Sequence, residues 1–234
     1  MILYFIRHGW PNYEIDGLTK TGQYQADATS EALKNIDFET IYASELGRAY
    51  ETETYLAKKQ NKEIVKLHWT REDLAGQQFG AFDETIGGFS WIFWIDKYRS
   101  KMIELADDME FYKDEVFQDV PVEAGVKRIN NAVDDWFKSM NIIHDRKTKT
   151  YHQIGDKHVP EYIALFAHGG MAMATISSIL DLPYSYFSTH YNCLDTCGVV
   201  VIDIDLDVHV ARMWKYNQIF YDPSVNPDKD EVKF

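Results

Sequence analysis

The sequence predicts a three-layer α/β/α fold built around a mostly parallel central sheet. Two uninterrupted apolar runs, residues 2–6 and 162–167, are typical of strands that are buried on both faces. Helical patterns alternate with strand patterns along the chain, which favours a parallel sheet with helices on both faces. With 234 residues and 45% hydrophobic content, the chain is long enough for one domain with a large core. We therefore expect a single domain over residues 1–234.

The first part of the chain alternates strand and helix in a regular order. After the strand at residues 2–6, residues 10–17 have turn composition, and Thr19 or Thr21 can cap a helix that extends to about residue 36. Residues 38–43 are the next predicted strand. Ser44 is a natural N-cap for a helix over residues 46–59. A short strand follows at 64–69, and residues 71–80 have loop composition.

The second part contains a segment that interrupts this alternation. Residues 81–120 are rich in aromatic side chains with largely helical spacing, and we expect a helical insertion over the strand ends; an ordinary pair of core helices is the alternative. Pro121 starts a long amphipathic helix to about residue 143. A hairpin that turns at Gly155 and Asp156 leads into the strand at 162–167, a helix follows at 171–180, and strands at 198–206 and 209–216 form a last hairpin.

The charge balance excludes some classes of partner. The net charge is −13 and no cluster of Lys and Arg is present, which argues against nucleic acid and against anionic membranes as partners. A small phosphorylated molecule stays possible, because a few converging Arg side chains can set the local field. No apolar run reaches membrane-spanning length, and the first strand directly after Met1 leaves no room for a signal peptide, so we expect a cytoplasmic protein. The sequence leaves the oligomeric state open.

The sequence shows no metal-binding pattern. Cys193 and Cys197 have no second Cys pair and no His between them, so two reduced structural thiols are expected. Asp203, Asp205 and Asp207 alternate with apolar residues, but the Gly and the late Glu of a calcium loop do not follow. We expect no metal and no cofactor.

Two of the predicted strands end in the same kind of residue. Arg7, His8 and Gly9 follow the first apolar run, and His168 with Gly169 and Gly170 follows the run at 162–167. In open α/β sheets, ligands bind outside the carboxyl ends of the strands, so one shared site is expected there. Arg48 falls in the first turn of a predicted helix, where a cation opposes the helix dipole unless an anion lies between them. Arg48 is therefore a candidate phosphate ligand.

In this order, these motifs resemble the histidine phosphatase superfamily, which has the phosphoglycerate mutase-like fold. The match consists of Arg7-His8-Gly9, the segment Ser-Glu-Leu-Gly-Arg-Ala-Tyr-Glu-Thr at 44–52, and His168-Gly169-Gly170. It extends to Leu18-Thr19, Gly22 and Gln25-Ala26, and to Glu72 with Gly76 and Gly80. The resemblance covers nearly the whole chain except the insertion at 81–120.

The resemblance assigns roles that suit phosphoryl transfer. His8 is expected to be the nucleophile, since neutral imidazole attacks phosphorus well, and Arg7 and Arg48 bind the phosphoryl oxygens. The resemblance makes His168 the second histidine of the pocket and adds Gly169 and Asn12 as phosphate contacts, although Asn12 comes earlier than the family's usual Asn. Glu72 matches the proton donor by its spacing to the two glycines. Asp73 is the rival, and Asp83 and Glu84 are further candidates.

The resulting expectation is a metal-independent phosphatase of a small phosphorylated metabolite that works through a phosphohistidine on His8. A phosphoglycerate mutase and a non-catalytic domain that binds a phosphorylated ligand are the alternatives. Gly170 resembles the phosphatase branch, because mutases tend to carry a polar residue after His-Gly. The identity of the ester cannot be read from the sequence.

Overall fold

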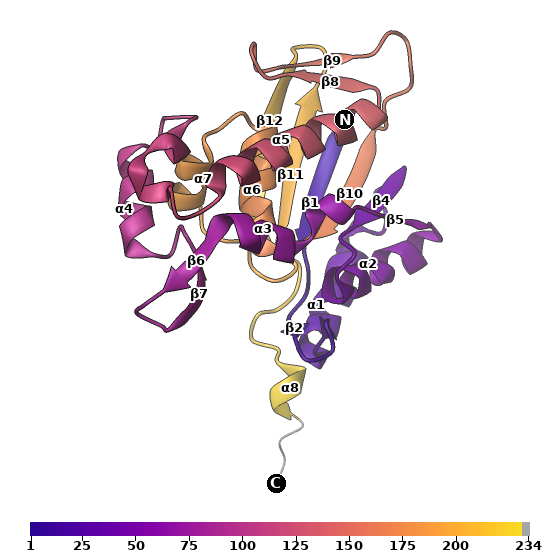
Figure 1. The fold of residues 1–234 in the computed structure, drawn as a ribbon. Helices are drawn as coiled ribbons and strands as arrows, with labels where there is room; N and C mark the ends of the chain where they lie inside the picture. Colours follow the sequence, from indigo (N-terminus) through magenta and orange to yellow (C-terminus); the bar gives the residue numbers. More distant parts are fainter. Residues whose placement is uncertain (231–234) are drawn as a thin grey trace.

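The computed structural model describes residues 1–230, which form one six-stranded sheet with helices on both sides (Figure 1). Its strand order is β12-β11-β1-β10-β4-β5. The strands are β1 (Ile2–Arg7), β4 (Thr40–Ala43), β5 (Ile64–Lys66), β10 (Tyr162–Ala167), β11 (Val199–Asp205) and β12 (Val210–Gln218). Strand β11 runs against its two neighbours, whereas β1, β10, β4 and β5 pair in parallel. The predicted mostly parallel sheet is confirmed.

The helices complete the three layers. One face of the sheet is covered by α1 (Lys20–Leu33) and α2 (Gly47–Gln60), and the other by α3 (Glu72–Phe79), α5 (Val122–Ser139) and α6 (Gly169–Ile179). Helix α4 (Asp96–Glu104) packs on α7 (Tyr184–His190) at the outer side of this second layer. The predicted α/β/α architecture is confirmed.

The alternation of side chains along β1 shows how the sheet separates two cores. Leu3 and Phe5 are fully buried in the core beneath α3, α5 and α6, whereas Ile6 lies in the core beneath α1 and α2. Because successive residues of a strand point to opposite faces, a run of apolar residues is what a strand covered on both sides requires.

Helix α2 carries one buried group that this packing does not satisfy. Glu53 is fully buried, and neither carboxylate oxygen has a hydrogen-bond partner within the described part of the chain. Burial raises the pKa of Glu53 to about 8. The carboxyl group is therefore mostly protonated in the folded protein at neutral pH.

The helix starts agree only in part with the expected caps. Thr19 caps α1, because its side chain accepts a hydrogen bond from the Gly22 amide. Ser44 is not the N-cap of α2. The cap residue is Leu46, and the Ser44 hydroxyl instead accepts a 3.4 Å bond from the Leu46 amide.

Three segments differ from the sequence prediction. Residues expected as a loop at 71–80 contain α3, and the first part of the expected helical insertion is a β-hairpin of β6 (Gly80–Asp83) and β7 (Gly88–Trp91). The hairpin expected at 151–160 lies earlier, as β8 (Ile142–Asp145) and β9 (Thr150–Gln153).

The remaining short elements are β2 (Pro11–Asn12), β3 (Gly17–Leu18), α8 (Pro227–Asp230) and 3₁₀ turns at His68–Thr70, Phe111–Lys113 and Glu115–Phe117. Within residues 1–230, no helix is long and apolar enough to cross a membrane.

Candidate active site

The strand register brings the two predicted histidines together. Arg7 of β1 lies beside Ala167 of β10 in the parallel register, so His8 and His168 leave adjacent strands at the same edge of the sheet. The His8 amide donates to the Ala167 carbonyl at 2.9 Å, and the centres of the two imidazole rings are 5.1 Å apart. His8 is 3% exposed and His168 is fully buried. The two predicted strand ends therefore lie side by side, and their two histidines are close together.

The surroundings of His8 favour a neutral ring with one nitrogen free. Its Nδ1 lies 2.7 Å from the Gly9 carbonyl oxygen, which can only accept, so this nitrogen carries the proton and Nε2 keeps its lone pair. Burial lowers the pKa of His8 to about 3 against the opposing Gly9 bond, and the charges of Arg7 and Arg48 act in the same direction as burial. Neutral imidazole with a free Nε2 is the form that can attack phosphorus.

His168 is held by a hydrogen bond between its Nε2 atom and Ser44 at the end of β4. The Ser44 hydroxyl oxygen is 2.9 Å from His168 Nε2, and the carboxylate oxygen Oε2 of Glu72 lies 3.8 Å from His168 Nδ1, which favours the tautomer in which Ser44 donates to Nε2. His168 Nδ1 then carries the proton, and this atom is buried without a partner among the described residues. Burial, with the nearby His8 and the Arg side chains, holds the pKa of His168 well below its usual value. His168 is thus a neutral hydrogen-bond donor.

Two guanidinium groups lie beside the histidines. Arg7 Nη1 donates to the Leu194 carbonyl, and Arg48 Nη1 donates to Asp16 Oδ1 at 2.5 Å. The second oxygen of Asp16 accepts from the Gly47 amide at 2.6 Å, so Asp16 fixes both the first turn of α2 and the guanidinium that this turn carries. The Nε atoms of Arg7 and Arg48 are buried and have no acceptor in the described chain.

Glu72, the predicted proton donor, begins α3 and faces the same site. Its Oε1 accepts from the Gly170 amide at 2.9 Å, and its Oε2 lies 3.8 Å from His168 Nδ1. Oε2 is buried without a hydrogen-bond partner among residues 1–230. One carboxylate oxygen is therefore used for position, and the other remains available for proton transfer.

The rival carboxylates are engaged elsewhere. Asp73 forms two hydrogen bonds with Arg71, which hold its pKa below the usual value. Asp83 binds the backbone and hydroxyl of Thr85 in its own turn, and Glu84 is exposed in the same loop. These contacts favour Glu72 over its rivals as the proton donor.

The remaining predicted phosphate contacts, Asn12 and Gly169, have different surroundings. The Asn12 side chain accepts from the Glu14 amide at 3.1 Å in an exposed turn, and its role as a phosphate ligand stays a prediction. Gly169 packs closely, because a Cβ atom there would lie 2.7 Å from Cys193 Sγ and 3.2 Å from Arg7 Nε. Only glycine lets the start of α6 approach Arg7 so closely.

A cavity of about 660 Å³ opens beside this cluster. Arg48 and Glu72 lie on its site-facing wall, and the other residues come from α3 and the β6–β7 hairpin. Its lining consists of Leu46, Arg48, Glu72, Asp73, Gly76, Gln77, Gly80, Ala81, Phe82, Phe89 and Trp91. A volume of this size suits a small organic molecule.

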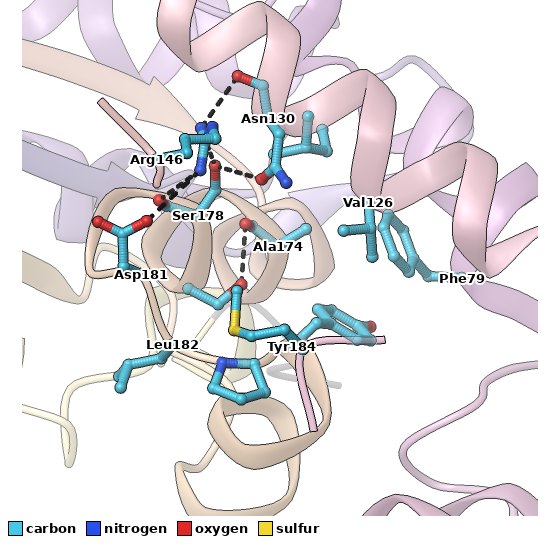
Figure 2. Close-up of a pocket in the computed structure, with 13 residues that line it drawn as sticks. Phe79, Val126, Asn130, Arg146, Ala174, Ser178, Asp181, Leu182 and Tyr184 are labelled. Atoms are coloured by element: carbon cyan, nitrogen blue, oxygen red, sulfur yellow. Dashed lines mark hydrogen bonds and ion pairs between the residues drawn. The ribbon is translucent and has the colours of Figure 1, made fainter. Parts of the chain in front are cut away.

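A second cavity, between α5 and α6, contains none of the predicted site residues (Figure 2). It measures about 20 Å³, roughly the space of one water molecule. Arg146 closes one side, where it binds Ser178 and both oxygens of Asp134. Asp134 and Asp181 also flank the buried His144 at 3.1 and 2.8 Å. This cluster joins β8 to α5 and to the end of α6, which is a structural role.

Sequence reasoning missed three residues that order the site. Ser44, which the sequence predicts as a helix cap, is bonded to His168, and Asp16, in the predicted turn at residues 10–17, is bonded to Arg48. Thr52 accepts from the Gly9 amide at 2.9 Å and so holds the backbone next to His8. Ser44 and Thr52 are the first and last residues of the matched segment at 44–52, and Asp16 lies in the predicted turn at residues 10–17. In the described part of the chain, no group of three or more His, Cys, Asp or Glu side chains is placed to hold a metal ion.

Comparison with known proteins matches one part of the chain to a family model. Residues 3–87 match the model of the histidine phosphatase superfamily (branch 1), which confirms the resemblance. This region includes Arg7, His8, Arg48 and Glu72. No curated protein sequence matches the chain significantly.

Solved structures of phosphatases share the fold along almost the entire chain. A mycobacterial glucosyl-3-phosphoglycerate phosphatase is similar at 19% identity with a TM-score of 0.60, covering 92% of this chain and 98% of its own. A phosphoserine phosphatase from Entamoeba histolytica has 19% identity and a TM-score of 0.60, covering 93% and 96%. The α-ribazole phosphatase of Shigella flexneri has 18% identity and a TM-score of 0.59, also covering 93% and 96%. At these identities the likeness shows the histidine phosphatase fold.

Proposed function

We propose that this protein is a metal-independent phosphomonoesterase that hydrolyses a small phosphorylated metabolite through a phosphohistidine on His8. One observation carries the proposal. Near His8, three buried donor atoms have no acceptor among residues 1–230: Arg7 Nε, Arg48 Nε and His168 Nδ1. Buried donors without partners are costly, and a phosphoryl group would supply the acceptors for all three. The phosphatases named above, whose fold this chain shares, act on phosphate monoesters, which agrees with this reading.

In the first step, His8 Nε2 attacks the phosphorus atom and the bond from phosphorus to the ester oxygen breaks. Arg7 and Arg48 neutralise the phosphoryl oxygens, and His168 donates Nδ1–H to one of them. The departing oxygen takes a proton from Glu72, whose carboxyl group is favoured in the protonated form by the phosphate dianion beside it. The products of this step are the free alcohol and phospho-His8.

In the second step, water enters the position of the alcohol. Glu72, now ionised, accepts a proton from this water while the oxygen attacks phosphorus and the bond to His8 Nε2 breaks. Inorganic phosphate leaves, and both His8 and Glu72 return to their starting protonation states. The charge for the reaction comes from the two Arg side chains, so the scheme requires no metal ion.

The test is a screen of phosphorylated metabolites for phosphate release, combined with acid and base treatment of the trapped protein. A phosphohistidine is labile in acid and stable in base, and it should appear on the wild type but not on His8→Ala. Isomerisation of a phosphoglycerate without net phosphate release would identify a mutase instead. Binding without any turnover would identify a non-catalytic domain.

A further inference from the structure

The cavity beside the histidines has an aromatic wall that the phosphoryl chemistry does not use. Phe82 and Phe89 of the β6–β7 hairpin line it and are 68% and 56% exposed, and Trp91 of the same hairpin is half-buried. Phe89 and Trp91 meet edge to face, with ring centres 5.8 Å apart. Behind them, Trp91 stacks on the buried Phe93 at an interplanar angle of 9°. The wall is thus supported from behind and open toward the cavity.

Close contacts join this aromatic wall to the phosphate-binding end of the site. A Cβ atom on Gly170 would lie 2.3 Å from Trp91 Cζ2, so the indole rests on the backbone that donates to Glu72. A Cβ atom on Gly80 would lie 1.9 Å from Phe89 Cε2. The rings of Trp91 and Phe89 therefore occupy the space that a side chain at Gly170 or at Gly80 would need. A phosphate ester held between the two histidines would direct its alcohol part along this wall.

The charges of the cavity exclude a second acidic group on the ligand. Arg48 is the only cation among the described residues that line it, and Arg48 is assigned to the phosphoryl group. Arg71 is close by in sequence, but it is paired with Asp73 at 2.8 Å and lies 3.7 Å from Glu45. Of the two acidic lining groups, Glu72 carries the proton for the departing oxygen when the ester is bound, and Asp73 is a carboxylate that would repel an anion.

We propose that the β6–β7 hairpin selects phosphate monoesters whose alcohol part carries an uncharged, planar apolar group and no carboxylate or second phosphate. This inference rests on the proposed function, since it names the substrate class of the same site. Phe82 and Phe89 are the specificity-determining residues, because their exposed rings can stack on a flat group or meet its edge. Trp91 closes the inner end of the wall.

Three alkyl esters with similar leaving groups test the proposal: phenylpropyl phosphate, propyl phosphate, and a propyl phosphate that ends in a carboxylate. The phenyl ester should have a kcat/KM about 10- to 100-fold above that of propyl phosphate, from burial of one aromatic ring. The carboxylate ester should fall below propyl phosphate. Calorimetric titration with phenylbutylphosphonate and butylphosphonate, which cannot be hydrolysed at phosphorus, should show the same order of affinity.

Two variants assign the preference to the hairpin. Phe89→Ala and Phe82→Ala should each lower the ratio of phenylpropyl to propyl phosphate by roughly 2- to 10-fold, the range expected for one aromatic contact. Trp214→Ala is the matched control, because Trp214 is 58% exposed on β12 and does not line the cavity. This control should retain the wild-type ratio.

The two measurements separate the substrate class from the reaction. Phosphate release with equal kcat/KM for the phenyl and propyl esters, or with a preference for the carboxylate ester, would overturn the substrate class and leave the phosphatase intact. Tighter binding of the phenyl phosphonate without release of phosphate from any ester would support the aromatic wall and overturn the phosphatase. An unchanged ratio in both hairpin variants would overturn the assignment to Phe82 and Phe89.

Discussion

Replacing Glu72 by Gln distinguishes two roles of this residue: the proposed donation of a proton to the departing oxygen, and the hydrogen bond to the Gly170 amide. Gln keeps a carbonyl oxygen for the 2.9 Å bond from the Gly170 amide, so the start of α6 should stay in place. The amide cannot protonate the departing oxygen. General acid catalysis typically contributes about 10²–10⁴-fold, and an alkyl phosphate should lose that much in the first step. An activated aryl phosphate should lose much less, because its leaving group departs without a proton.

Glu72→Ala provides the structural comparison. It also removes the bond to Gly170, and a hydrogen bond to a charged group contributes about 1.5–3 kcal/mol. We therefore expect Ala, but not Gln, to lower the free energy of unfolding by up to this amount.

The assay is rapid-quench measurement of phospho-His8 formation, which isolates the first step from the second, in which the same carboxylate acts as a base. Equal losses for alkyl and aryl esters in that step would refute Glu72 as the acid, and Asp73 would be the next residue to test.

Four further outcomes are expected. His8→Ala should abolish turnover and acid-labile phosphate while circular dichroism shows an intact fold, and near-wild-type turnover would contradict the nucleophile. EDTA should leave activity unchanged, because Arg7 and Arg48 supply the charge; a loss that one divalent ion restores would contradict this. Because burial lowers the pKa of His8 to about 3, its ¹⁵N signals should stay those of a neutral ring from about pH 5 to 8, and a titration there would contradict the assignment. The pKa of Glu53 rises from 4.5 to about 8 on folding. The contribution of this group to the free energy of unfolding is therefore highest below about pH 4.5 and falls as the pH rises toward 8, because the buried carboxyl group resists ionisation. Glu53→Gln should therefore raise the free energy of unfolding by roughly 3 kcal/mol at pH 7 and by little at pH 4 in urea titrations.

The sequence was sufficient to predict a mostly parallel sheet and to place the two histidines at the same edge of it. Apolar runs that are buried on both faces have few alternatives, and parallel neighbours bring their carboxyl ends to one edge. The apolar runs before His8 and His168 therefore place both residues at the carboxyl edge of the sheet, whereas the pairing of β1 with β10 is seen only in the structure. Arg48 follows from its place in the first turn of α2.

The parts that depend on tertiary contacts were not predictable in the same way. Helix α3 has only eight residues, including one glycine, and it packs against α5 and α6. The turn of the β8–β9 hairpin contains Lys149 at φ 57° and no glycine, whereas Gly155 and Asp156, which have turn composition, follow the hairpin. In the β6–β7 hairpin, Phe89 and Trp91 alternate as in a strand, but the surrounding aromatic residues also fit helical spacing.

The contact between Gly170 and Trp91 constrains the order in which substitutions at these two positions could occur. A polar side chain at position 170, the kind that resembles the mutase branch, would have to occupy space 2.3 Å from the indole ring. Phe93 stacks on the indole, so the ring cannot simply turn aside. A smaller residue at 91 must therefore come first, and it would dismantle the aromatic wall before any new group arrived. By evolution or by design, a path from this chain toward that branch passes through an intermediate without the aromatic wall, to which we assign the choice of substrate.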